Sequence, residues 1–230
     1  MTTVLTLDGG AEDATSAWTP RALGAVYGVV LNTTSQLQAL GDAASLPPYK
    51  ALPAAPVLYI KPPNTLAGDA AVIALPPGVE ALEMGATLAI VIGRTACRVG
   101  EAEALGHVLG YAAAIDVCIP HASLYRPALK QRCRDGFLPI SPRLANPERV
   151  GDPDALEIVT TVNGAEHARW STSELVRPVA RLIADVTDFM TLFPGDVLLA
   201  GLSGAPAHAG AGDRVEVAID GVGRISCEVR

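Results

Sequence analysis

Five basic side chains could form an anion site in a chain that is acidic as a whole. The 230-residue sequence has a formal net charge of −7 at pH 7, which argues against nucleic acid and repels polyanions at long range. An anion site therefore requires a local cluster of cations, and the candidates are Lys61, Arg126, Lys130, Arg132 and Arg134. For Lys130 we expect ordinary solvated surface. Guanidinium groups can hold a carboxylate through two parallel hydrogen bonds, but the charges alone do not distinguish a carboxylate site from ordinary solvated surface.

Alternate residues of a strand point to the same side, so two acidic residues spaced by one position can aim two carboxylates at a single cation. The apolar segment Thr87–Ile92 is a predicted strand, but the alternate positions at its start hold Gly85 and Thr87, which supply no carboxylate. We expect Glu80 and Glu83 to be solvated loop residues. A two-residue step covers roughly 7 Å and a Mg–O bond about 2.1 Å, so Glu83 cannot replace a missing ligand without a register shift.

The other reactive residue types show little metal or nucleophile patterning. There is no His-x-His or His-Glu-x-x-His spacing, so a zinc enzyme is not indicated. Of the histidines, His121, which follows the predicted strand Ala112–Val117, is the one we expect to lie near a ligand pocket. Ser203 lacks the Gly-x-Ser-x-Gly context of a serine nucleophile. The four cysteines have no CxxC pairing and are expected to be reduced, mostly buried thiols of a cytoplasmic protein: Cys97, Cys118, Cys133 and Cys227.

Hydrophobic patterning predicts one compact, β-rich domain over residues 23–230, after a flexible tail over residues 1–22. The expected strands are Val26–Leu31, Val57–Ile60, Val72–Leu75, Thr87–Ile92, Ala112–Val117, Leu156–Val162, Val197–Ala200, Arg214–Ile219 and Gly223–Val229. Helices are expected over Glu101–Leu109 and Ser173–Phe189, a hairpin turn at Asn163-Gly164, and a flexible loop over Ala205–Gly212. No apolar run is long enough to span a bilayer, and Met1–Asp8 does not resemble a signal peptide.

Six short motifs follow one another between residues 24 and 230. They are Gly28-Val-Val-Leu-Asn32, Tyr59-Ile-Lys61-Pro-Pro-Asn64, Gly110-Tyr111-Ala-Ala-Ala-Ile-Asp116, Arg132-Cys-Arg134-Asp135, Met190-Thr-Leu-Phe-Pro194-Gly195-Asp196 and Gly221-Val-Gly223. In this order they resemble the fumarylacetoacetate hydrolase family. The resemblance implies an α+β, mostly β fold, a β-roll or β-sandwich with a few short helices, and assembly into dimers.

The resemblance also implies a metal site that this chain has largely lost. Family members carry Glu-x-Glu where this sequence has Gly85 and Thr87, so Asp116 is the retained ligand. We therefore expect no cofactor on this chain, with Mg²⁺ or Mn²⁺ bound only weakly or on a partner subunit. The family's Gly-Thr-Pro reads Gly201-Leu202-Ser203, and the lid segment 32–37 lacks the usual His–Glu pair, which disfavours hydrolysis by an activated water.

A narrower resemblance points to one branch of the family. Pro48-Tyr49-Lys50-Ala51, Leu124-Tyr125-Arg126-Pro127-Ala128 and Cys133-Arg134-Asp135-Gly136-Phe137 are similar to the N-terminal unit of the bifunctional isomerase/decarboxylases of 4-hydroxyphenylacetate (homoprotocatechuate) degradation. That implies work on 5-oxopent-3-ene-1,2,5-tricarboxylate and 2-hydroxyhepta-2,4-diene-1,7-dioate. The chain looks like a separately encoded subunit, acting as a homodimer or with a second family subunit.

By this resemblance Arg132, Tyr125, His121 and Asp135 are the candidate catalytic residues, and Lys61, Arg126 and Asn64 the candidate substrate-binding residues. Arg132 would be an electrostatic clamp, since arginine does not titrate near neutral pH. Tyr125, His121 or Asp135 would move protons. Two alternatives stay open. The chain could be a catalytically silent partner of a metal-bearing subunit, or a hydrolase or decarboxylase for another acylpyruvate-like substrate.

Overall fold

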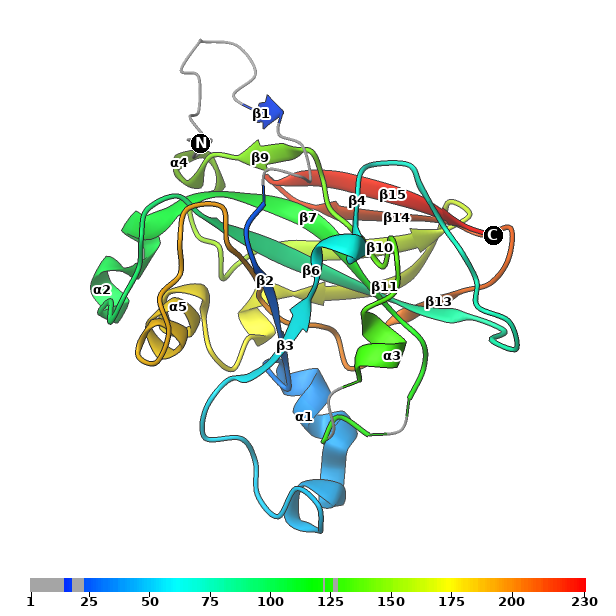
Figure 1. The fold of residues 1–230 in the computed structure, drawn as a ribbon, viewed down its shortest axis with the longest axis horizontal. Helices are drawn as coiled ribbons and strands as arrows, with labels where there is room; N and C mark the ends of the chain where they lie inside the picture. The colour runs from blue at the N-terminus through cyan, green and yellow to red at the C-terminus, as the bar shows by residue number, and fades with distance from the viewer. Residues whose placement is uncertain (1–14, 18–22, 122, 126–127) are drawn as a thin grey trace.

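The computed structural model describes residues 15–17, 23–121, 123–125 and 128–230. Most of the predicted tail, and the candidate Arg126, lie outside these residues. Within the predicted tail, Thr15–Ala17 form strand β1, which pairs antiparallel with β9 (Arg143–Ala145). The predicted α+β, mostly β fold with short helices is confirmed (Figure 1).

The larger sheet has eight strands and holds the candidate site. Its order is β1-β9-β7-β6-β12-β2-β3, with β13 also paired to β6. Besides β1 and β9, its strands are β2 (Val26–Val30), β3 (Val57–Lys61), β6 (Leu82–Ile92), β7 (Val108–Cys118), β12 (Val197–Leu199) and β13 (Ala207–Ala209). Figure 1 shows β6 and β7 as the long central pair.

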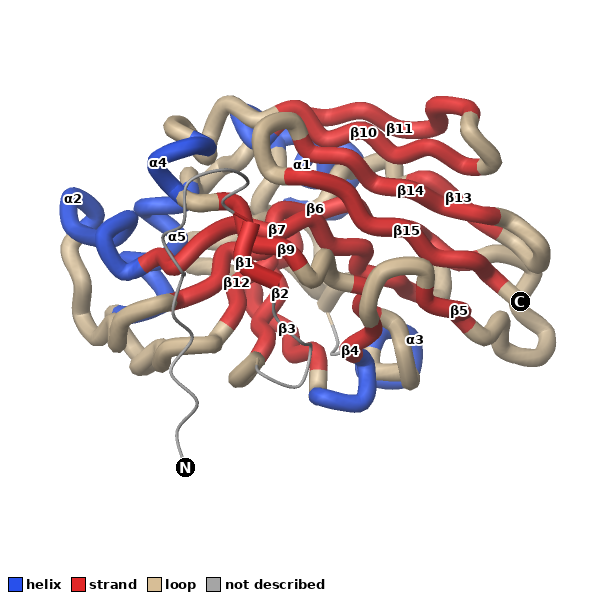
Figure 2. The backbone as a smooth tube through the Cα atoms, turned by 90° about the horizontal axis from the view of Figure 1, so that it is seen from above, coloured by secondary structure: helices blue, strands red, loops and turns tan. Residues whose placement is uncertain are grey.

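A second, five-stranded sheet packs beside the first and closes the core. Its order is β11-β10-β14-β15-β5, from β5 (Ala71–Ile73), β10 (Glu157–Val162), β11 (Ala165–Ser171), β14 (Arg214–Ile219) and β15 (Gly223–Val229). Figure 2 shows β10, β11, β14 and β15 lying side by side. A short pair joins β4 (Leu66–Ala67) and β8 (Leu138–Pro139). Apolar side chains of both sheets, such as Leu88, Ile115 and Val217, share one buried core.

Short helices surround the sheets. They are α1 (Thr34–Leu40), α2 (Glu101–Ala104), α3 (Leu129–Arg132), α4 (Pro147–Val150) and α5 (Val179–Thr187), with 3₁₀ turns η2 (Gly41–Ser45), η3 (Pro63–Thr65), η4 (Leu105–His107) and η5 (Thr172–Glu174). In Figure 1, α1 and α3 lie at the same end of the molecule, whereas α2 and α5 lie together at its side. None of the helices in the described part of the chain has the length and apolar character needed to cross a membrane.

Several predicted elements differ from the observed ones. The helix expected over Ser173–Phe189 begins only at Val179: η5 ends at Glu174, and Pro178, which disfavours helical backbone in the residue before it, forms the helix cap. The helix expected over Glu101–Leu109 stops at Ala104 and continues as η4, and Val108 already belongs to β7. The segment expected to be a flexible loop over Ala205–Gly212 contains β13, which pairs with β6.

Strand β6 also begins earlier than predicted, at Leu82 rather than Thr87. This extension was missed because Gly85 interrupts the apolar pattern, and glycine weakens a strand prediction. It pairs Gly85 with Asp116 and Glu83 with Cys118 across the β6–β7 ladder. The predicted hairpin turn is confirmed, since Asn163 and Gly164 both have positive φ, at 52° and 81°.

Candidate active site

Asp116 is the centre of a buried charge cluster. It lies near the end of β7, and only 1% of its surface is exposed. Its Oδ1 lies 2.5 Å from the Lys61 Nζ, and its Oδ2 accepts a 2.7 Å hydrogen bond from Arg132 Nη1. The Tyr59 hydroxyl donates to the same Oδ2. Burial alone would raise the pKa of Asp116, but Lys61 and Arg132 hold it below its ordinary value, so the residue is a carboxylate.

Lys61 is a structural cation behind Asp116. It ends β3, and its ammonium donates to the carbonyls of Val117 at 3.0 Å, Arg132 at 2.9 Å and Phe137 at 2.9 Å. Burial lowers the pKa of Lys61, and the neighbouring carboxylate opposes this shift. Since an ammonium has three donors, these carbonyls and Asp116 leave none for a ligand. The sequence predicted Lys61 to bind substrate; it is not among the residues that line the adjacent cavity.

Arg132 is the cation of the cluster that faces the cavity. It is the last residue of α3, it is 5% exposed, and its guanidinium carbon lies 4.7 Å from the centre of the Tyr59 ring. Burial alone would lower the pKa of Arg132, but Asp116 raises it above the ordinary value. Among the described residues its side-chain hydrogen bonds use Nη1 alone. Nε and Nη2 are therefore available to hold a ligand oxygen, and the cluster of one carboxylate and two cations carries a net positive charge.

The position that binds a metal in the resembled family does not fit one here. A β-carbon built on Gly85 would lie 2.8 Å from Cδ2 of Leu202 and 2.8 Å from the carbonyl oxygen of Asp116, so this space is already filled. Thr87 is fully buried and offers only a neutral hydroxyl, which has no hydrogen-bond partner among the described residues. Lys61 and Arg132 already supply the positive charge that a cation would bring to Asp116. No catalytic step is assigned to a metal at this position.

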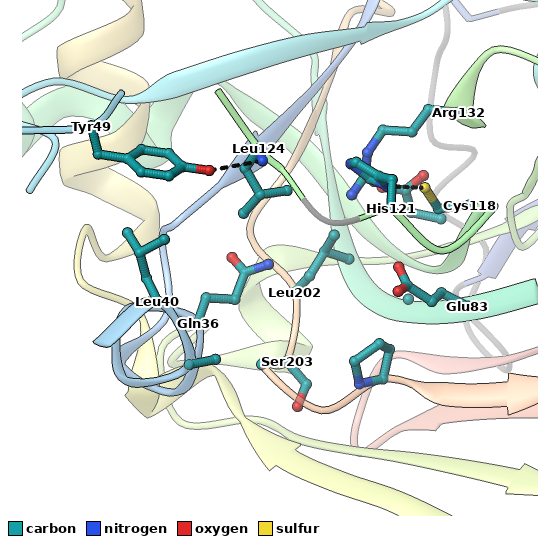
Figure 3. A pocket seen from close by; sticks show the side chains of 15 residues that line it. Gln36, Leu40, Tyr49, Glu83, Cys118, His121, Leu124, Arg132, Leu202 and Ser203 are labelled. Carbon is teal, nitrogen blue, oxygen red and sulfur yellow. Dashed lines mark hydrogen bonds and ion pairs between the residues drawn. The ribbon is translucent and has the colours of Figure 1, made fainter. Parts of the chain in front are cut away.

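A cavity of about 230 Å³ opens in front of this cluster. Figure 3 shows its side chains, which come from α1, the loop after η2, the start of β6, the end of β7 and the segment after it, α3, and the loop before β13. Gln36 Oε1 accepts a 2.7 Å hydrogen bond from the backbone N–H of Leu31, which fixes the side chain on the cavity wall. Tyr49 accepts a 2.9 Å hydrogen bond from the N–H of Leu124 and so links two sides of the wall.

Two predicted site residues pair with each other away from this cavity. Asn64 donates a 2.7 Å hydrogen bond to Asp135 Oδ1, and both side chains are exposed. Tyr125 is 57% exposed and stacks edge-on with Tyr49 at 5.9 Å between ring centres. It lines a second cavity of about 300 Å³, which shares His121, Leu124 and Arg132 with the first. Of the three predicted proton carriers, His121 lines both cavities that Arg132 borders, Tyr125 lines the second, and Asp135 lines neither.

Sequence reasoning missed two polar residues of the cavity wall. Glu83, expected in a solvated loop, lies on β6 and is only partly exposed, because the strand begins at Leu82. Cys118 is buried at the end of β7, 3.4 Å from Nδ1 of His121. Burial raises the pKa of the Cys118 thiol to about 12, so the neighbouring imidazole does not make it a free thiolate nucleophile. Both residues could have been found from the register of β6 against β7, which pairs Glu83 with Cys118. That register is not visible in either segment alone.

Comparison with known proteins identifies the family of this chain. Residues 25–230 match the model of the fumarylacetoacetate (FAA) hydrolase C-terminal family. The chain is 42% identical over 198 residues to the 4-hydroxyphenylacetate degradation bifunctional isomerase/decarboxylase of Escherichia coli, covering 86% of this chain and 45% of that protein. It therefore spans less than half the length of this curated relative.

Solved structures of family enzymes have a similar fold. The structure of 2-hydroxyhepta-2,4-diene-1,7-dioate isomerase from Mycobacterium marinum is similar with a TM-score of 0.74 and 28% identity, over 90% of this chain and 74% of that one. That of 5-carboxymethyl-2-hydroxymuconate delta-isomerase from Mycobacterium smegmatis has a TM-score of 0.75 and 29% identity, over 89% and 76%. From the match over residues 25–230 and the shared fold, the chain belongs to the fumarylacetoacetate hydrolase family.

Proposed function

We propose that this chain is an enzyme subunit of 4-hydroxyphenylacetate catabolism that decarboxylates 5-oxopent-3-ene-1,2,5-tricarboxylate and isomerises 2-hydroxyhepta-2,4-diene-1,7-dioate. The names of its relatives suggest the reaction class. The observation that carries the proposal is the guanidinium of Arg132, which faces the cavity from a buried cluster of net positive charge. In an acidic chain, such a cluster concentrates positive charge where a multiply charged carboxylate can bind.

The proposed chemistry needs a stabilised negative charge and a proton carrier. When the bond to the departing carboxylate breaks, its electron pair moves into the conjugated oxo system and forms an enolate-like oxygen. The isomerisation passes through a similar charge. Arg132, fixed by Asp116 before the substrate arrives, would stabilise that oxygen without reorganisation. Arg132 cannot give up its proton, so we assign proton transfer to His121, the predicted carrier that lines both cavities bordered by Arg132.

A catalytically silent role is the second candidate, and one specific observation favours it. A β-carbon at Gly85, where the family carries a glutamate, would meet Leu202, and Asp116 is paired with two cations; both contacts disfavour metal-dependent chemistry on this chain. In that case this chain would stabilise an active, metal-bearing partner. A third candidate, a different acylpyruvate-like substrate for the same cavity, has the same requirement for Arg132.

For either role we propose assembly with a second family unit, another copy of this chain or a paralogous subunit. Three apolar side chains around the second cavity are half exposed, namely Ile60 at 50%, Leu129 at 53% and Tyr125 at 57%. Clusters of exposed apolar side chains commonly mark interaction surfaces. The patch adjoins α3, so a partner seated there would also hold Arg132 in position.

The experiment is an assay of the purified chain on both proposed substrates, alone and with the candidate partner, with EDTA or with Mg²⁺. The proposal expects activity of the chain alone that EDTA does not remove, that Arg132→Ala abolishes, and that Arg134→Ala preserves. Arg134 is a matched control, because its Nε donates to the Lys130 carbonyl and the residue does not line the cavity.

Activity that appears only with the partner, and that survives Arg132→Ala, would establish the silent role instead. Turnover of neither substrate, but of another acylpyruvate in an Arg132-dependent manner, would establish the third candidate.

A further inference from the structure

Three potential metal ligands lie close to Gly85 and Asp116. Two of them, Glu83 and Cys118, are on strands β6 and β7, and the third, His121, follows β7. Glu83 is two residues before Gly85 and Cys118 two residues after Asp116, and the register pairs Glu83 with Cys118. Alternate residues of a strand share a face, so this second pair faces the same cavity as the first. His121 follows three residues after Cys118 and completes the group, as Figure 3 shows.

The spacing of these donors is close to that of a coordinated ion. One donor atom from each of Glu83, Cys118 and His121 lies within 4.8 Å of the others. Zinc bonds to sulfur, nitrogen and oxygen are about 2.0–2.3 Å long, which puts tetrahedral ligands about 3.3–3.7 Å apart. The imidazole ring of His121 already contacts the Cys118 thiol, since Nδ1 lies 3.4 Å from Sγ, and Nε2 is the ring nitrogen that is left to bind an ion. A rotation of the partly exposed Glu83 side chain would bring its carboxylate to the same separation.

The histidine is also oriented as a ligand would be. Its Nδ1 lies 3.2 Å from the carbonyl oxygen of Ile119 and can donate to it. In that tautomer Nε2 keeps its lone pair, and this buried atom has no hydrogen-bond partner among the described residues. Ligating histidines commonly donate their other ring N–H to a backbone carbonyl in this way. A purely structural histidine would leave a buried acceptor unsatisfied, which is costly.

We propose that Glu83, Cys118 and His121 form a binding site for Zn²⁺ or a similar borderline divalent cation, separate from the family's metal position. Thiolate and imidazole ligands favour Zn²⁺ over Mg²⁺, which prefers oxygen ligands alone. Binding of the ion displaces the proton of the Cys118 thiol, which is released to solvent. The carboxylate and the resulting thiolate then balance the two charges of the ion, so the site stays compatible with the cationic cluster beside it. Three protein ligands leave a fourth position for water or for a carboxylate oxygen of a ligand in the cavity.

Metal binding and proton transfer by His121 are alternatives, because a bound ion occupies the lone pair that would accept the proton. The site does not depend on the proposed reaction, and its test reads binding rather than turnover. A failed decarboxylase assay would leave this inference intact, and a failed binding experiment would leave the proposed function intact.

The test uses Co²⁺ as a spectroscopic substitute for Zn²⁺ on the purified, metal-stripped full chain, kept reduced with a phosphine. We expect one Co²⁺ per chain with a near-ultraviolet thiolate-to-cobalt absorption band, displaced by Zn²⁺. Cys118→Ser should abolish the band, and Glu83→Gln and His121→Gln should each weaken binding at least about tenfold, the range typical for lost metal partners. Cys97→Ser is the matched control, since Cys97 is exposed and outside the cavity, and it should leave band and affinity unchanged.

Several outcomes would overturn the proposal: no thiolate band at saturating Co²⁺, a band that survives Cys118→Ser, or a band lost in Cys97→Ser. Circular dichroism checks the folding of each variant. If Cys118→Ser does not fold, Glu83→Gln decides, because this partly exposed residue can be changed with little effect on the core. Unaltered Co²⁺ affinity in folded Glu83→Gln would then reject the site.

Discussion

Leu202 occupies the space in front of Gly85, so that a β-carbon added at Gly85 would lie 2.8 Å from the Leu202 Cδ2 atom. Both residues stand where the family's usual pattern has polar ones, a glutamate at 85 and a threonine at 202. The two departures are thus coupled in space: the glycine makes room for the leucine, and the leucine takes the space that a side chain at position 85 would need. Lys61 and Arg132 neutralise the carboxylate that remains, Asp116.

The first prediction is that Gly85→Ala destabilises the protein. The new methyl group meets Leu202 and the Asp116 carbonyl, both closer than real β-carbons approach, and overpacking a core typically costs about 1–3 kcal/mol. Urea unfolding measures the change in the free energy of unfolding. Gly68→Ala is the control, since nothing lies within 4 Å of a β-carbon there. Equal stability of the two variants would show that the space beside Leu202 is open.

The same overlap revises what the sequence alone suggests about rebuilding the metal site. From the motif, Gly85→Glu with Thr87→Glu should restore two ligands opposite Asp116. With Leu202 in place and both cations retained, we expect this double variant to be destabilised and to gain no Mg²⁺ affinity. Calorimetric titration of the folded fraction would contradict this if a Mg²⁺ site appeared.

The second prediction is that the unaltered chain does not bind Mg²⁺ at Asp116. Its carboxylate is paired with Lys61 and accepts hydrogen bonds from Arg132 and Tyr59, and a hydrated Mg²⁺ would have to displace two fixed cations to reach it. Isothermal titration with Mg²⁺ should give no heat beyond dilution. A micromolar site that disappears in Asp116→Asn would contradict the charge assignment of this cluster.

The third prediction concerns removal of the central carboxylate. Asp116→Asn leaves two buried cations without their counter-charge, and breaking a buried pair in this way costs about 3–5 kcal/mol. Urea unfolding at neutral pH should show this loss. Glu166→Gln provides the contrast, because the ion pair of Glu166 with Arg169 is exposed and such pairs contribute little. A loss no larger than that of Glu166→Gln would mean that the Asp116 cluster is not held as described.

The fourth prediction gives the pH dependence of that contribution. The folded state holds the pKa of Asp116 below the ordinary value of 3.8. Between the folded-state and unfolded-state pKa values, unfolding therefore takes up a proton, and the free energy of unfolding decreases as the pH is lowered. The contribution of Asp116 is therefore complete above about pH 4 to 5 and is lost as pH falls through the lowered folded-state value. The stability difference between the unaltered chain and Asp116→Asn should shrink over this acid range. A difference that stays constant down to pH 2 would contradict it.

The sequence was sufficient for those parts of the fold that depend on local pattern. Strand β3 and the Asn163-Gly164 hairpin follow from apolar runs and from a turn that requires positive φ. The start of β6 was not predictable in this way, since Gly85 and Glu83 look like loop residues until β7 supplies a pairing partner. The pairing of Asn64 with Asp135, away from the cavity, likewise depends on tertiary packing.

For the site, the motifs identified Asp116 and Arg132, and the position after the predicted strand Ala112–Val117 identified His121. Lys61 carries the charge expected of a substrate-binding residue, yet its position at the end of β3 turns the ammonium toward three backbone carbonyls. The donor group around Cys118 had no motif to reveal it, because its members come together through strand register and a short turn. Register is set by the whole sheet and is not readable from any one segment.

The fifth prediction tests the cationic cavity directly. Arg132 has Nε and Nη2 free of side-chain hydrogen bonds among the described residues, and a charge-assisted hydrogen bond contributes about 1.5–3 kcal/mol. Arg132→Ala should therefore weaken binding of a dicarboxylate such as glutarate at least about tenfold. Arg132→Lys keeps the charge but loses the planar fork, so it should recover only part of the affinity. Calorimetric titration provides the affinities, with Arg134→Ala as the control of equal charge change.

Arg126 lies outside the described residues, and its role is predicted from the sequence alone. On that prediction, Arg126→Ala should weaken dicarboxylate binding as much as Arg132→Ala does. Unchanged affinity in folded Arg132→Ala and Arg126→Ala would remove the anion site and favour the silent-partner role.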